Sequence, residues 1–338
     1  MVPRAIRPLD VARFLFFREG IVMLLQIILL VVGFVILIKG ADFFVDGASS
    51  TAQNFKVSKM LIGLTIVAFG TSAPEFAVSV KALLSGNGDM VLGNVIGSNI
   101  LNILLILGVS ATIHSLTVKN NTVKKELPII LLITSLFAVL LSDHFFDSSL
   151  PNSFTRSDGI VLLLFFLVFI YYLISMMRRK IDVDEEAPKM SLKKSIFFTI
   201  FGLIAIVIGS NFVVDSASFI AKEIGVTERM ISLTIIALGT SLPELVTSVM
   251  ATKKGEYDIA IGNIVGSNIF NIGIVIGLPI ALFGGIDRIA FSYIDLIVMF
   301  VSALLLFLFS WKDYKISKKE GIAFLVLFVV YYSYVILG

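Results

Sequence analysis

Ten apolar stretches, each near the length of a membrane-spanning helix, run through this chain of 338 residues. A helix needs about 20 mostly apolar residues to cross the hydrocarbon core of a bilayer. The stretches lie at 21–44, 58–84, 90–113, 127–142, 159–177, 195–219, 230–251, 258–283, 290–310 and 321–337. They are continuously apolar rather than alternating, which argues against a transmembrane β-barrel. We therefore expect an all-α integral membrane protein with ten transmembrane helices.

The composition indicates that the bilayer is the surrounding solvent. The chain is 57% apolar and 15% charged, and its mean hydropathy is +1.00. Cysteine is absent, which excludes disulfides and thiolate metal sites. The sequence contains no nucleotide-binding loop and no nucleophile–base constellation, so we expect neither an enzyme nor a nucleic-acid-binding protein.

The first 20 residues depart from this pattern. They form an amphipathic stretch that contains Arg4, Arg7, Arg13, Phe14, Phe16, Phe17 and Arg18. An interfacial helix is one interpretation. The basic start before an apolar run also resembles a signal peptide, although no small-residue cleavage site follows. A natural start at Met23 is a third interpretation, and the sequence leaves the three open.

The charged connection 178–194 is the clearest boundary in the chain. It separates 21–177 from 195–338, and each part holds five of the ten stretches. Lysine and arginine gather in the connections on one side of the ten spans, the side that includes 178–194. Cytoplasmic loops carry such an excess. We expect this connection in the cytoplasm and both termini outside the cell, in a multi-pass protein of the plasma membrane.

The two parts repeat the same sequence. LTIVAFGTSAPE starts at Leu64 and LTIIALGTSLPE at Leu233, while GNVIGSNILNI from Gly93 matches GNIVGSNIFNI from Gly262. Matching positions differ in number by 169 throughout, without a gap. Five spans is an odd number, so the second copy must enter the membrane from the opposite side. We therefore expect two inverted five-helix repeats, an arrangement typical of transporters with a site near the midplane.

Each repeat places a glutamate and a proline in the middle of an apolar stretch. GTSAPE ends at Glu75 and GTSLPE ends at Glu244. Proline removes a helical hydrogen bond, so carbonyls at 68–71 and 237–240 become available to a ligand. A carboxylate inside the membrane is costly and usually marks a transport or proton pathway. A protonated glutamate that merely bridges two helices is the alternative.

The next span of each repeat adds a second polar line. Ser98 and Asn102 are four residues apart and share a helix face, as do Ser267 and Asn271. We predict that these four side chains bind a cation, with interhelical hydrogen bonding as the alternative.

Other polar residues of these spans receive structural interpretations. Asn99 and Asn268 lie on a different face, where we expect them to hold helices together. Asp89 and Asp258 start their spans and are predicted to be helix N-caps. We also expect solvated side chains at the span-end residues Asp42, Asp46 and Asp215.

The predicted ligands are carboxylate, hydroxyl, amide and carbonyl oxygens. Such hard ligands suit calcium, which takes six to eight of them, and sodium. Two ionised glutamates balance the charge of one Ca²⁺. No lysine or arginine lies at the centre, which disfavours anionic substrates, whereas ligand type alone does not exclude Mg²⁺.

The paired GTSxPE segments, each followed by GNxxGSNxxN, resemble the α-repeats of the calcium/cation antiporter superfamily. The resemblance is to its sodium/calcium exchanger branch, of prokaryotic type, and it covers the whole ten-span plan. The calcium/proton exchanger branch typically carries a GNATE-type segment, which this sequence lacks.

The resemblance implies a secondary active antiporter that exchanges Na⁺ for Ca²⁺ by alternating access. Glu75 and Glu244 would be the central calcium ligands, together with the carbonyls of Thr71 and Thr240. Flanking sodium sites would use Ser72, Ser98, Ser241 and Ser267, with the carbonyls of Ala68 and Ala237, and Asn102 and Asn271 would line the middle. The ligands would be the transported ions, and we expect neither a cofactor nor an obligate protein partner.

Departures and alternatives follow from the same positions. Some prokaryotic relatives and the potassium-dependent branch carry aspartate where this chain has Asn102 or Asn271, which puts potassium dependence in doubt. A Ca²⁺/H⁺ antiporter on the same scaffold is the alternative function; a cation channel and a purely structural membrane protein are further ones.

The resemblance also implies a moving part. The first and sixth spans would slide against the remaining helices. The glycines of these two spans, Gly33, Gly40, Gly202 and Gly209, are compatible with such sliding.

Overall fold

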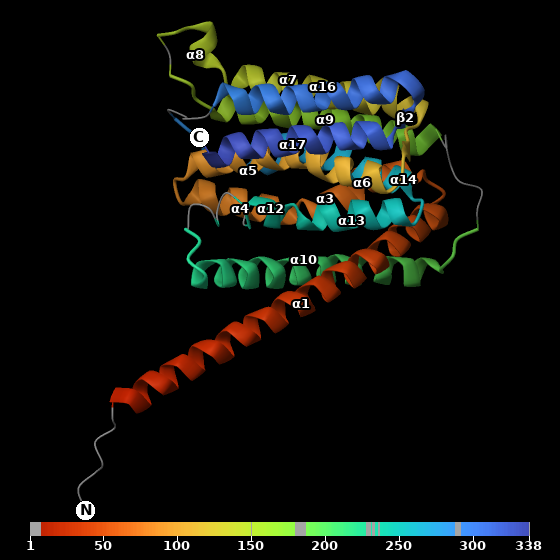
Figure 1. The fold of residues 1–338 in the computed structure, drawn as a ribbon. Helices are drawn as coiled ribbons and strands as arrows, with labels where there is room; N and C mark the ends of the chain where they lie inside the picture. The colour runs from red at the N-terminus through yellow and green to blue at the C-terminus, as the bar shows by residue number, and fades with distance from the viewer. Residues whose placement is uncertain are drawn as a thin grey trace, which may run out of the picture.

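The chain forms a stack of long helices. The computed structural model describes residues 8–149, 151–179, 187–227, 231, 234, 235, 237–287 and 292–337. These residues are almost entirely helical, and the helices lie in rows with α1 (Pro8–Phe55) and α10 (Leu192–Glu223) together at one edge (Figure 1). Helix α1 crosses α10 obliquely, and its N-terminal part projects beyond the stack.

The first half of the chain contains one continuous helix followed by a chain of shorter ones. After α1 come α2 (Lys59–Ile62), η1 (Gly63–Val67), α3 (Ala68–Thr71), α4 (Ala73–Leu84), α5 (Gly88–Leu101), η2 (Asn102–Leu107), α6 (Gly108–Ile113), η3 (Thr122–Glu126), α7 (Leu127–Leu140), α8 (Asp143–Phe146) and α9 (Arg156–Arg179). The segments labelled η are π-helical turns that continue into their neighbours, so η2 joins α5 and α6 into one element.

The second half follows the same order. After α10 come α12 (Ala237–Thr240), α13 (Leu242–Lys253), α14 (Tyr257–Phe270), η5 (Asn271–Ile276), α15 (Gly277–Phe283), α16 (Tyr293–Asp313) and α17 (Lys318–Leu337). Two short strands, β1 (Leu116–Thr117) and β2 (Lys315–Ile316), pair antiparallel and tie the halves together at one end.

Seven of the described helices are long and apolar enough to cross a membrane. They are Ile21–Phe55, Gly88–Ile113, Arg156–Arg178, Leu192–Glu223, Tyr257–Phe283, Tyr293–Asp313 and Lys318–Leu337. An eighth span results if Lys59–Thr71 and Ala73–Leu84, which meet at a bend of 44°, are taken together. The expectation of a helical, multi-pass membrane protein is therefore confirmed.

The remaining predicted spans are not resolved by this criterion. Helix α7 is only 14 residues long, although η3 extends it, and it covers the predicted stretch 127–142. The predicted stretch 230–251 falls partly outside the described residues. In the leader, residues 1–7 also lie outside the described residues, and the backbone from Pro8 continues into the first span as a single helix.

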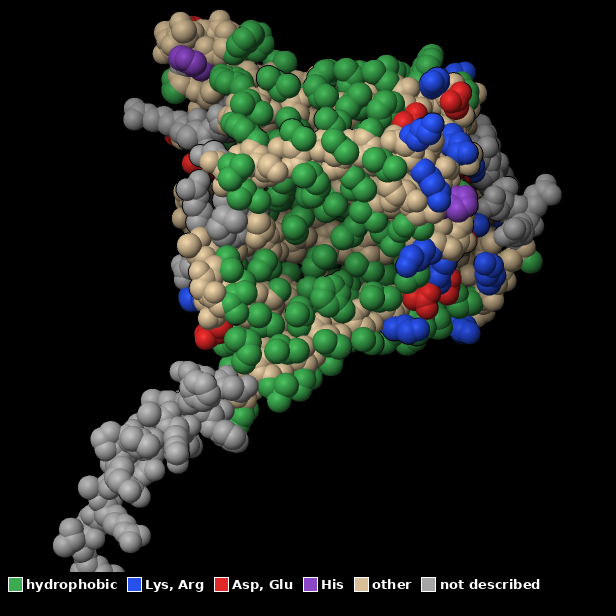
Figure 2. Space-filling view, in the orientation of Figure 1, with side chains coloured by type: hydrophobic (Ala, Val, Ile, Leu, Met, Phe, Trp, Pro, Cys, Tyr) green, Lys and Arg blue, Asp and Glu red, His purple; other side chains and the backbone are tan. Residues whose placement is uncertain are grey.

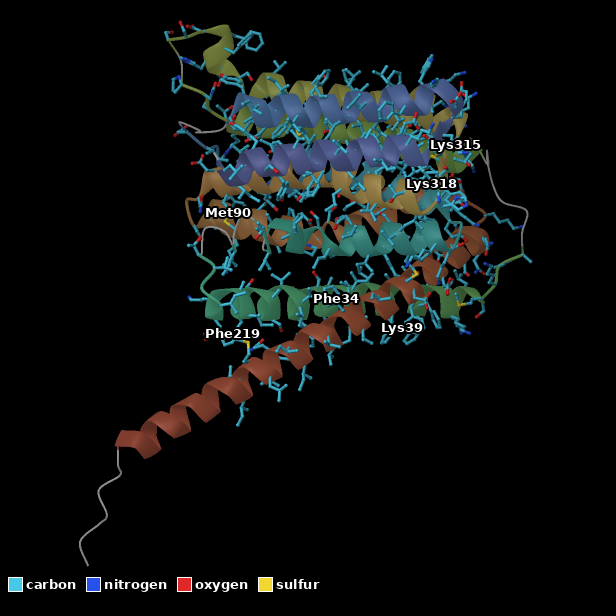
Figure 3. The ribbon with its side chains drawn as sticks, viewed as in Figure 1. Phe34, Lys39, Met90, Phe219, Lys315 and Lys318 are labelled. Atoms are coloured by element: carbon cyan, nitrogen blue, oxygen red, sulfur yellow. The ribbon has the colours of Figure 1, made fainter. Side chains whose placement is uncertain are left out.

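Around the middle of the stack, the outer surface is apolar, as expected for contact with a lipid bilayer. Apolar side chains cover its length, whereas lysine and arginine gather at one end (Figure 2). Lys315 and Lys318 lie at this end and Met90 at the opposite one (Figure 3). We call these the lysine end and the Met90 end. Exposed apolar side chains such as Leu164 and Val329, each more than half exposed, face outward because lipid rather than water surrounds them.

Glycines bring α1 and α10 into close contact. A Cβ on Gly40 would lie 2.9 Å from the Cβ of Ala205, and one on Gly202 would lie 2.7 Å from the carbonyl oxygen of Gly40. Gly33 and Gly209 face each other in the same way. These four glycines therefore join the two helices to each other, and the sliding of the first and sixth spans against the remaining helices stays a prediction.

Three expectations about aspartates are wrong. The N-cap of α5 is Asn87, whose Oδ1 accepts from the Met90 N–H at 3.2 Å, and Asp89 lies within the first turn. The N-cap of α14 is Glu256 rather than Asp258, and Asp258 pairs with Lys119 at 2.7 Å. The expectation that Asp42 and Asp46 are merely solvated is also wrong, because both pair with Lys254, as described below.

Candidate functional site

Each repeat contains a helix that breaks at its GTSxPE segment. Helix α3 ends at Thr71, Ser72 leaves the helical region with φ −81° and ψ 5°, and α4 starts at Ala73. Ser241 interrupts the second repeat in the same way, with φ −89° and ψ 4°, between α12 and α13. The prolines occupy first-turn positions, where a missing N–H costs no hydrogen bond. Each glutamate consequently lies in the first turn of a helix, where the helix dipole favours negative charge.

The two glutamates lie deep inside the stack and contact the opposite repeat. Glu75 and Glu244 are each 1% exposed. The hydroxyl of Ser72 donates to Glu244 Oε1 at 3.0 Å, and that of Ser241 donates to Glu75 Oε1 at 3.4 Å. The break of one repeat therefore holds the carboxylate of the other, which brings both carboxylates to one place between the repeats.

The serines of the neighbouring helices complete this polar cluster. Ser267 donates to Glu244 Oε1 at 3.5 Å, and Ser241 donates to the hydroxyl oxygen of Ser98 at 3.4 Å. Ser98 lies on α5 and Ser267 on α14, and both are buried. The four predicted serines thus divide between the two glutamates: Ser72 and Ser267 bond to Glu244, while Ser241 bonds to Glu75 and to Ser98.

Two further asparagines, which were not predicted as site residues, support the glutamates. Asn94 donates to the carbonyl oxygen of Glu75 at 3.0 Å and to Ser79 at 2.9 Å. Asn263 makes the matching contacts with the carbonyl of Glu244 at 3.5 Å and with Ser248 at 3.0 Å. The signal was present in the paired GN dipeptides, which keep the offset of 169.

The threonines and alanines before the breaks differ between the repeats. Thr71 is buried, and its hydroxyl lies 3.0 Å from Asn263 Oδ1 and 3.3 Å from the carbonyl oxygen of Ala68. That carbonyl also accepts from the Ser72 N–H at 3.0 Å. Thr240 and Ala237 are only partly buried, and the hydroxyl of Thr240 lies 3.5 Å from the Ala237 carbonyl.

Four asparagines form a layer beside the glutamates. Asn102 Nδ2 donates to Asn268 Oδ1 at 2.9 Å, and Asn271 Nδ2 donates to Asn99 Oδ1 at 3.1 Å. All four side chains are at most 2% exposed. Asn99 and Asn268 do connect helices, as expected, but they do so by bonding to the asparagines predicted as ligands.

Four buried oxygens at this place lack a hydrogen-bond donor among the described residues. They are Glu75 Oε2, Glu244 Oε2, Asn102 Oδ1 and Asn271 Oδ1. They form two pairs that keep the offset of 169, so both repeats contribute equally. A buried acceptor without a donor is costly, and a cation removes that cost by accepting oxygen ligands.

A cavity of about 630 Å³ reaches this network from the Met90 end. Its mouth is lined by Asn87, Asp89 and Ser292, and its inner part by Ser98 and Thr240. The cavity runs along α5 from Asp89 to Leu101, and Asn94 and Ser98 are among the polar side chains that line it.

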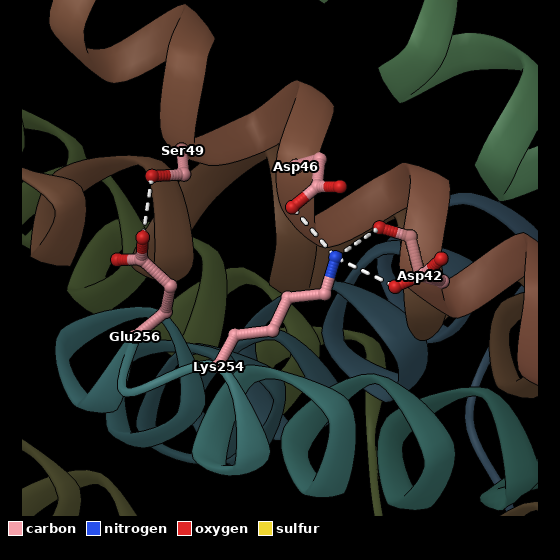
Figure 4. A network of polar contacts seen from close by, with 5 residues as sticks. All are labelled: Asp42, Asp46, Ser49, Lys254 and Glu256. Atoms are coloured by element: carbon pink, nitrogen blue, oxygen red, sulfur yellow. Dashed lines mark hydrogen bonds and ion pairs between the residues drawn. The ribbon is translucent and has the colours of Figure 1, made fainter. Parts of the chain in front are cut away.

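At the lysine end, polar contacts tie α1 to the turn between α13 and α14 (Figure 4). Lys254 Nζ lies 2.7 Å from Asp42 Oδ1 and 2.6 Å from Asp46 Oδ1. Ser49 donates to Glu256 Oε1 at 2.8 Å, and Lys59 Nζ lies 2.9 Å from the second oxygen of the same carboxylate. We call this set of six side chains the α1 latch: Asp42, Asp46, Ser49, Lys59, Lys254 and Glu256.

A membrane-embedded helical stack with paired buried carboxylates, and a cavity that reaches the serine beside them, has the general design of a cation transporter. The family model described as sodium/calcium exchanger protein matches residues 25–175 and 194–337. The chain belongs to this family, so it is a transporter rather than an enzyme, and the resemblance of its motifs is confirmed.

Individual relatives agree with this assignment. The chain is 39% identical to the putative antiporter CaxA of Alkalimonas amylolytica, over 91% of this chain and 98% of that one. It is 32% identical to the sodium/calcium exchanger MaX1 of Methanosarcina acetivorans, over 90% and 96%. A solved structure of the sodium-calcium exchanger NCX_Mj, soaked with Na⁺ and without Ca²⁺, matches with a TM-score of 0.79 and 33% identity, over 91% and 98%.

Proposed function

We propose that this chain exchanges Na⁺ for Ca²⁺ by alternating access, with both ions bound in turn around Glu75 and Glu244. The observation that carries the proposal is the set of four buried oxygens without donors, two carboxylate and two amide. Among the described residues, none donates a hydrogen bond to any of these four oxygens, and a bound cation would satisfy them together.

The chemistry of the set favours Ca²⁺ as one of the ions. Two ionised glutamates contribute a charge of −2, which a single Ca²⁺ neutralises. Six to eight oxygens surround calcium in proteins, and the four serine hydroxyls beside the carboxylates extend the available number. Sodium also takes hard oxygen ligands. We assign the serines and the carbonyls of Thr71, Thr240, Ala68 and Ala237 to flanking sodium sites.

The two carbonyls assigned to sodium differ in their present partners. The Ala68 carbonyl accepts from the Ser72 N–H, whereas the single hydrogen of the Thr71 hydroxyl has shorter contacts with the Val67 carbonyl oxygen at 3.1 Å and Asn263 Oδ1 at 3.0 Å. A carbonyl oxygen has two lone pairs, so the second one of Ala68 could bind sodium. Ala237 is more accessible, because it lines the cavity.

We further propose that the site lies on the pseudo-two-fold axis of two inverted five-helix repeats, 21–177 and 195–338. The cross-repeat pairs Ser72–Glu244 and Ser241–Glu75 support this symmetry, since each is the image of the other at the offset of 169. The lysine end would be cytoplasmic, together with the connection 178–194, because positive residues concentrate there. Both termini would then be extracellular, in the plasma membrane, and the cavity would open outward.

Sodium is favoured over protons as the coupling ion by the two asparagines. At Asn102 and Asn271 the chain has neutral amides, which do not titrate, where an aspartate would supply a third proton acceptor. The sodium/calcium exchanger MaX1 among the relatives agrees with sodium coupling. Ca²⁺/H⁺ exchange through the two glutamates is the alternative that the experiment must separate.

The deciding experiment measures uptake of radiolabelled Ca²⁺ into sodium-loaded proteoliposomes. We expect uptake driven by an outward sodium gradient at fixed pH, collapse of the uptake when sodium is equal on both sides, and no response to an imposed proton gradient alone. Glu75→Gln and Glu244→Gln should each lower the initial rate at least about 100-fold, because each removes a charged ligand from a buried site.

The opposite result is equally informative. Uptake that ignores sodium but follows a proton gradient, and is still lost in both glutamine variants, would replace sodium by protons at the same site. Uptake retained in either variant would contradict the assignment of the transport site to Glu75 and Glu244.

A further inference from the structure

The asparagine ligands differ from the carboxylate ligands because the orientation of an amide group decides whether it can bind a cation. An amide group has one oxygen and one NH₂ group, and only the oxygen can bind a cation. Asn102 and Asn271 therefore serve as ligands in one of two orientations. The two oxygens of an aspartate or glutamate are equivalent, so those side chains need no such selection.

The structure contains an acceptor for each of the two NH₂ groups. Asn102 Nδ2 donates to Asn268 Oδ1 at 2.9 Å, and Asn271 Nδ2 donates to Asn99 Oδ1 at 3.1 Å. Each pair joins the two repeats, because Asn102 and Asn99 lie in the first and the other two in the second. With the NH₂ groups engaged there, Asn102 Oδ1 and Asn271 Oδ1 are left as the buried oxygens without donors.

One of the two accepting side chains, Asn99, is itself held by a hydrogen bond. Asn99 Nδ2 donates to the carbonyl oxygen of Asn268 at 3.4 Å, which leaves its Oδ1 to face Asn271. Asn99 and Asn268 are each 2% exposed, so water does not compete for these bonds. Asn102 and Asn271 each begin a π-helical turn, η2 and η5, and such turns are frequent at functional sites.

We propose that Asn99 and Asn268 are positioning residues of the transport site. Each accepts the NH₂ group of the other repeat's asparagine and so turns the amide oxygen of that asparagine toward the cation. The inference rests on the proposed function, since it concerns how the same site presents its neutral ligands.

The first test replaces the acceptors by an apolar residue of similar size. In Asn268→Leu the amide of Asn102 loses its acceptor, and in Asn99→Leu that of Asn271 does. We expect each variant to raise the KM for Ca²⁺ about tenfold, as expected for the loss of one oriented ligand, with kcat changed less than about threefold. Asn54→Ala is the matched control, because this asparagine bonds to backbone carbonyls of Ser50 and Met190 far from the site.

A double-mutant cycle separates positioning from packing. In an Asn102→Asp background both oxygens of residue 102 are equivalent, so Asn268→Leu should now change KM less than about twofold. Asn99→Leu should still raise KM about tenfold in that background, because it acts on Asn271. An equal effect of Asn268→Leu in both backgrounds would overturn the proposal, since a packing defect does not depend on the chemistry of residue 102.

Two further measurements keep the outcomes distinct. If a leucine variant does not yield monodisperse protein, Asn268→Ala and Asn99→Ala run the same cycle with the same criterion. Wild type and Glu75→Gln are assayed in parallel for sodium-driven uptake. Failure there contradicts the proposed function, whereas normal wild-type exchange with an unchanged KM in the acceptor variants contradicts only the positioning role.

Discussion

The two repeats carry nearly the same motif in different surroundings. In the second repeat Gly266 of α14 packs so closely against α3 that an added Cβ would lie 2.6 Å from the Cβ of Ala68. In the first repeat Gly97 of α5 lines the cavity, and no described atom lies within 4 Å of such a Cβ, those of Ala237 included. The glycine at this position of the repeat is thus packed against a neighbouring helix in the second repeat and faces the cavity in the first.

We infer that this asymmetry belongs to a conformational state and not to the motifs. Because 97 and 266 are repeat partners, a structure in which Gly97 is packed and Gly266 is open would use the same contacts with the halves exchanged. Under the proposed topology, that exchange closes the cavity at the Met90 end and opens one at the lysine end, as alternating access requires.

A second difference lies in the α1 latch, which the motif repeat does not contain. At the offset of 169, Lys254 corresponds to Ser85 and Glu256 to Asn87, so the first repeat has no lysine at this place. Among the described residues, the latch joins α1 to the core at the lysine end, opposite the mouth of the cavity. It should therefore stabilise the state that is open at the Met90 end relative to its counterpart.

The largest expected effect comes from cross-linking across the two interfaces of α1. The chain has no cysteine, so pairs can be introduced cleanly. A short bismaleimide across Asp46→Cys and Lys254→Cys should abolish exchange, because it fixes α1 to the core. The same reagent across Phe43→Cys and Phe198→Cys, whose rings are 5.1 Å apart in the wild type, should leave exchange within about twofold, because we expect α1 and α10 to move together.

The opposite outcome for the two cross-links would contradict the expectation that α1 and α10 move as one unit against the core. Exchange lost only in the α1–α10 cross-link would mean that these two helices move against each other despite their glycine contacts. The measurement is sodium-driven Ca²⁺ uptake before and after reduction-insensitive cross-linking, with each single-cysteine variant as its control.

The second prediction uses the matched glycines. Gly266→Ala should lower the free energy of unfolding by about 1–3 kcal/mol, since the added methyl overlaps Ala68 in the present state. Gly97→Ala should leave the Tm unchanged but reduce turnover about tenfold, because residue 97 must pack when the cavity closes. Equal stability losses in both variants would mean that Gly97 is already packed in the resting protein.

The smallest effect is expected at the latch. Lys254→Ala removes partly exposed ion pairs, which contribute about 0.5–1 kcal/mol, so the state open at the Met90 end should become about two- to fivefold less favoured. The readout is the labelling rate of Val78→Cys, in the cavity lining, by a membrane-impermeant thiol reagent. Lys253→Ala, which changes the exposed neighbouring lysine, should label like the parent. Faster labelling in Lys254→Ala would contradict a latch.

High salt provides an independent check on the same contacts. Ionic screening weakens exposed ion pairs, so raising the ionic strength with a salt of an inert cation should slow labelling in the parent and have little effect in Lys254→Ala. A salt effect of equal size in both proteins would assign it to the reagent or to the cavity instead.

The sequence by itself determined the membrane environment, the repeat and the central residues. Long apolar stretches leave no other solvent, and a constant offset of 169 between Glu75 and Glu244 shows two related halves without any coordinates. The break at each GTSxPE segment was also predictable, because glycine and proline act on the local backbone.

Only the tertiary structure decided which of these groups meet and which state they occupy. The contacts of Ser72 with Glu244, and of Asn102 with Asn268, join residues more than 160 positions apart and depend on how the repeats pack. The glycines of the first and sixth spans proved to face each other rather than the core. A sequence that repeats its motif is symmetric at those positions, so it cannot say which half is closed. That choice lies in packing energies that differ between the two ends, to which Lys254 and its partners contribute at one end alone.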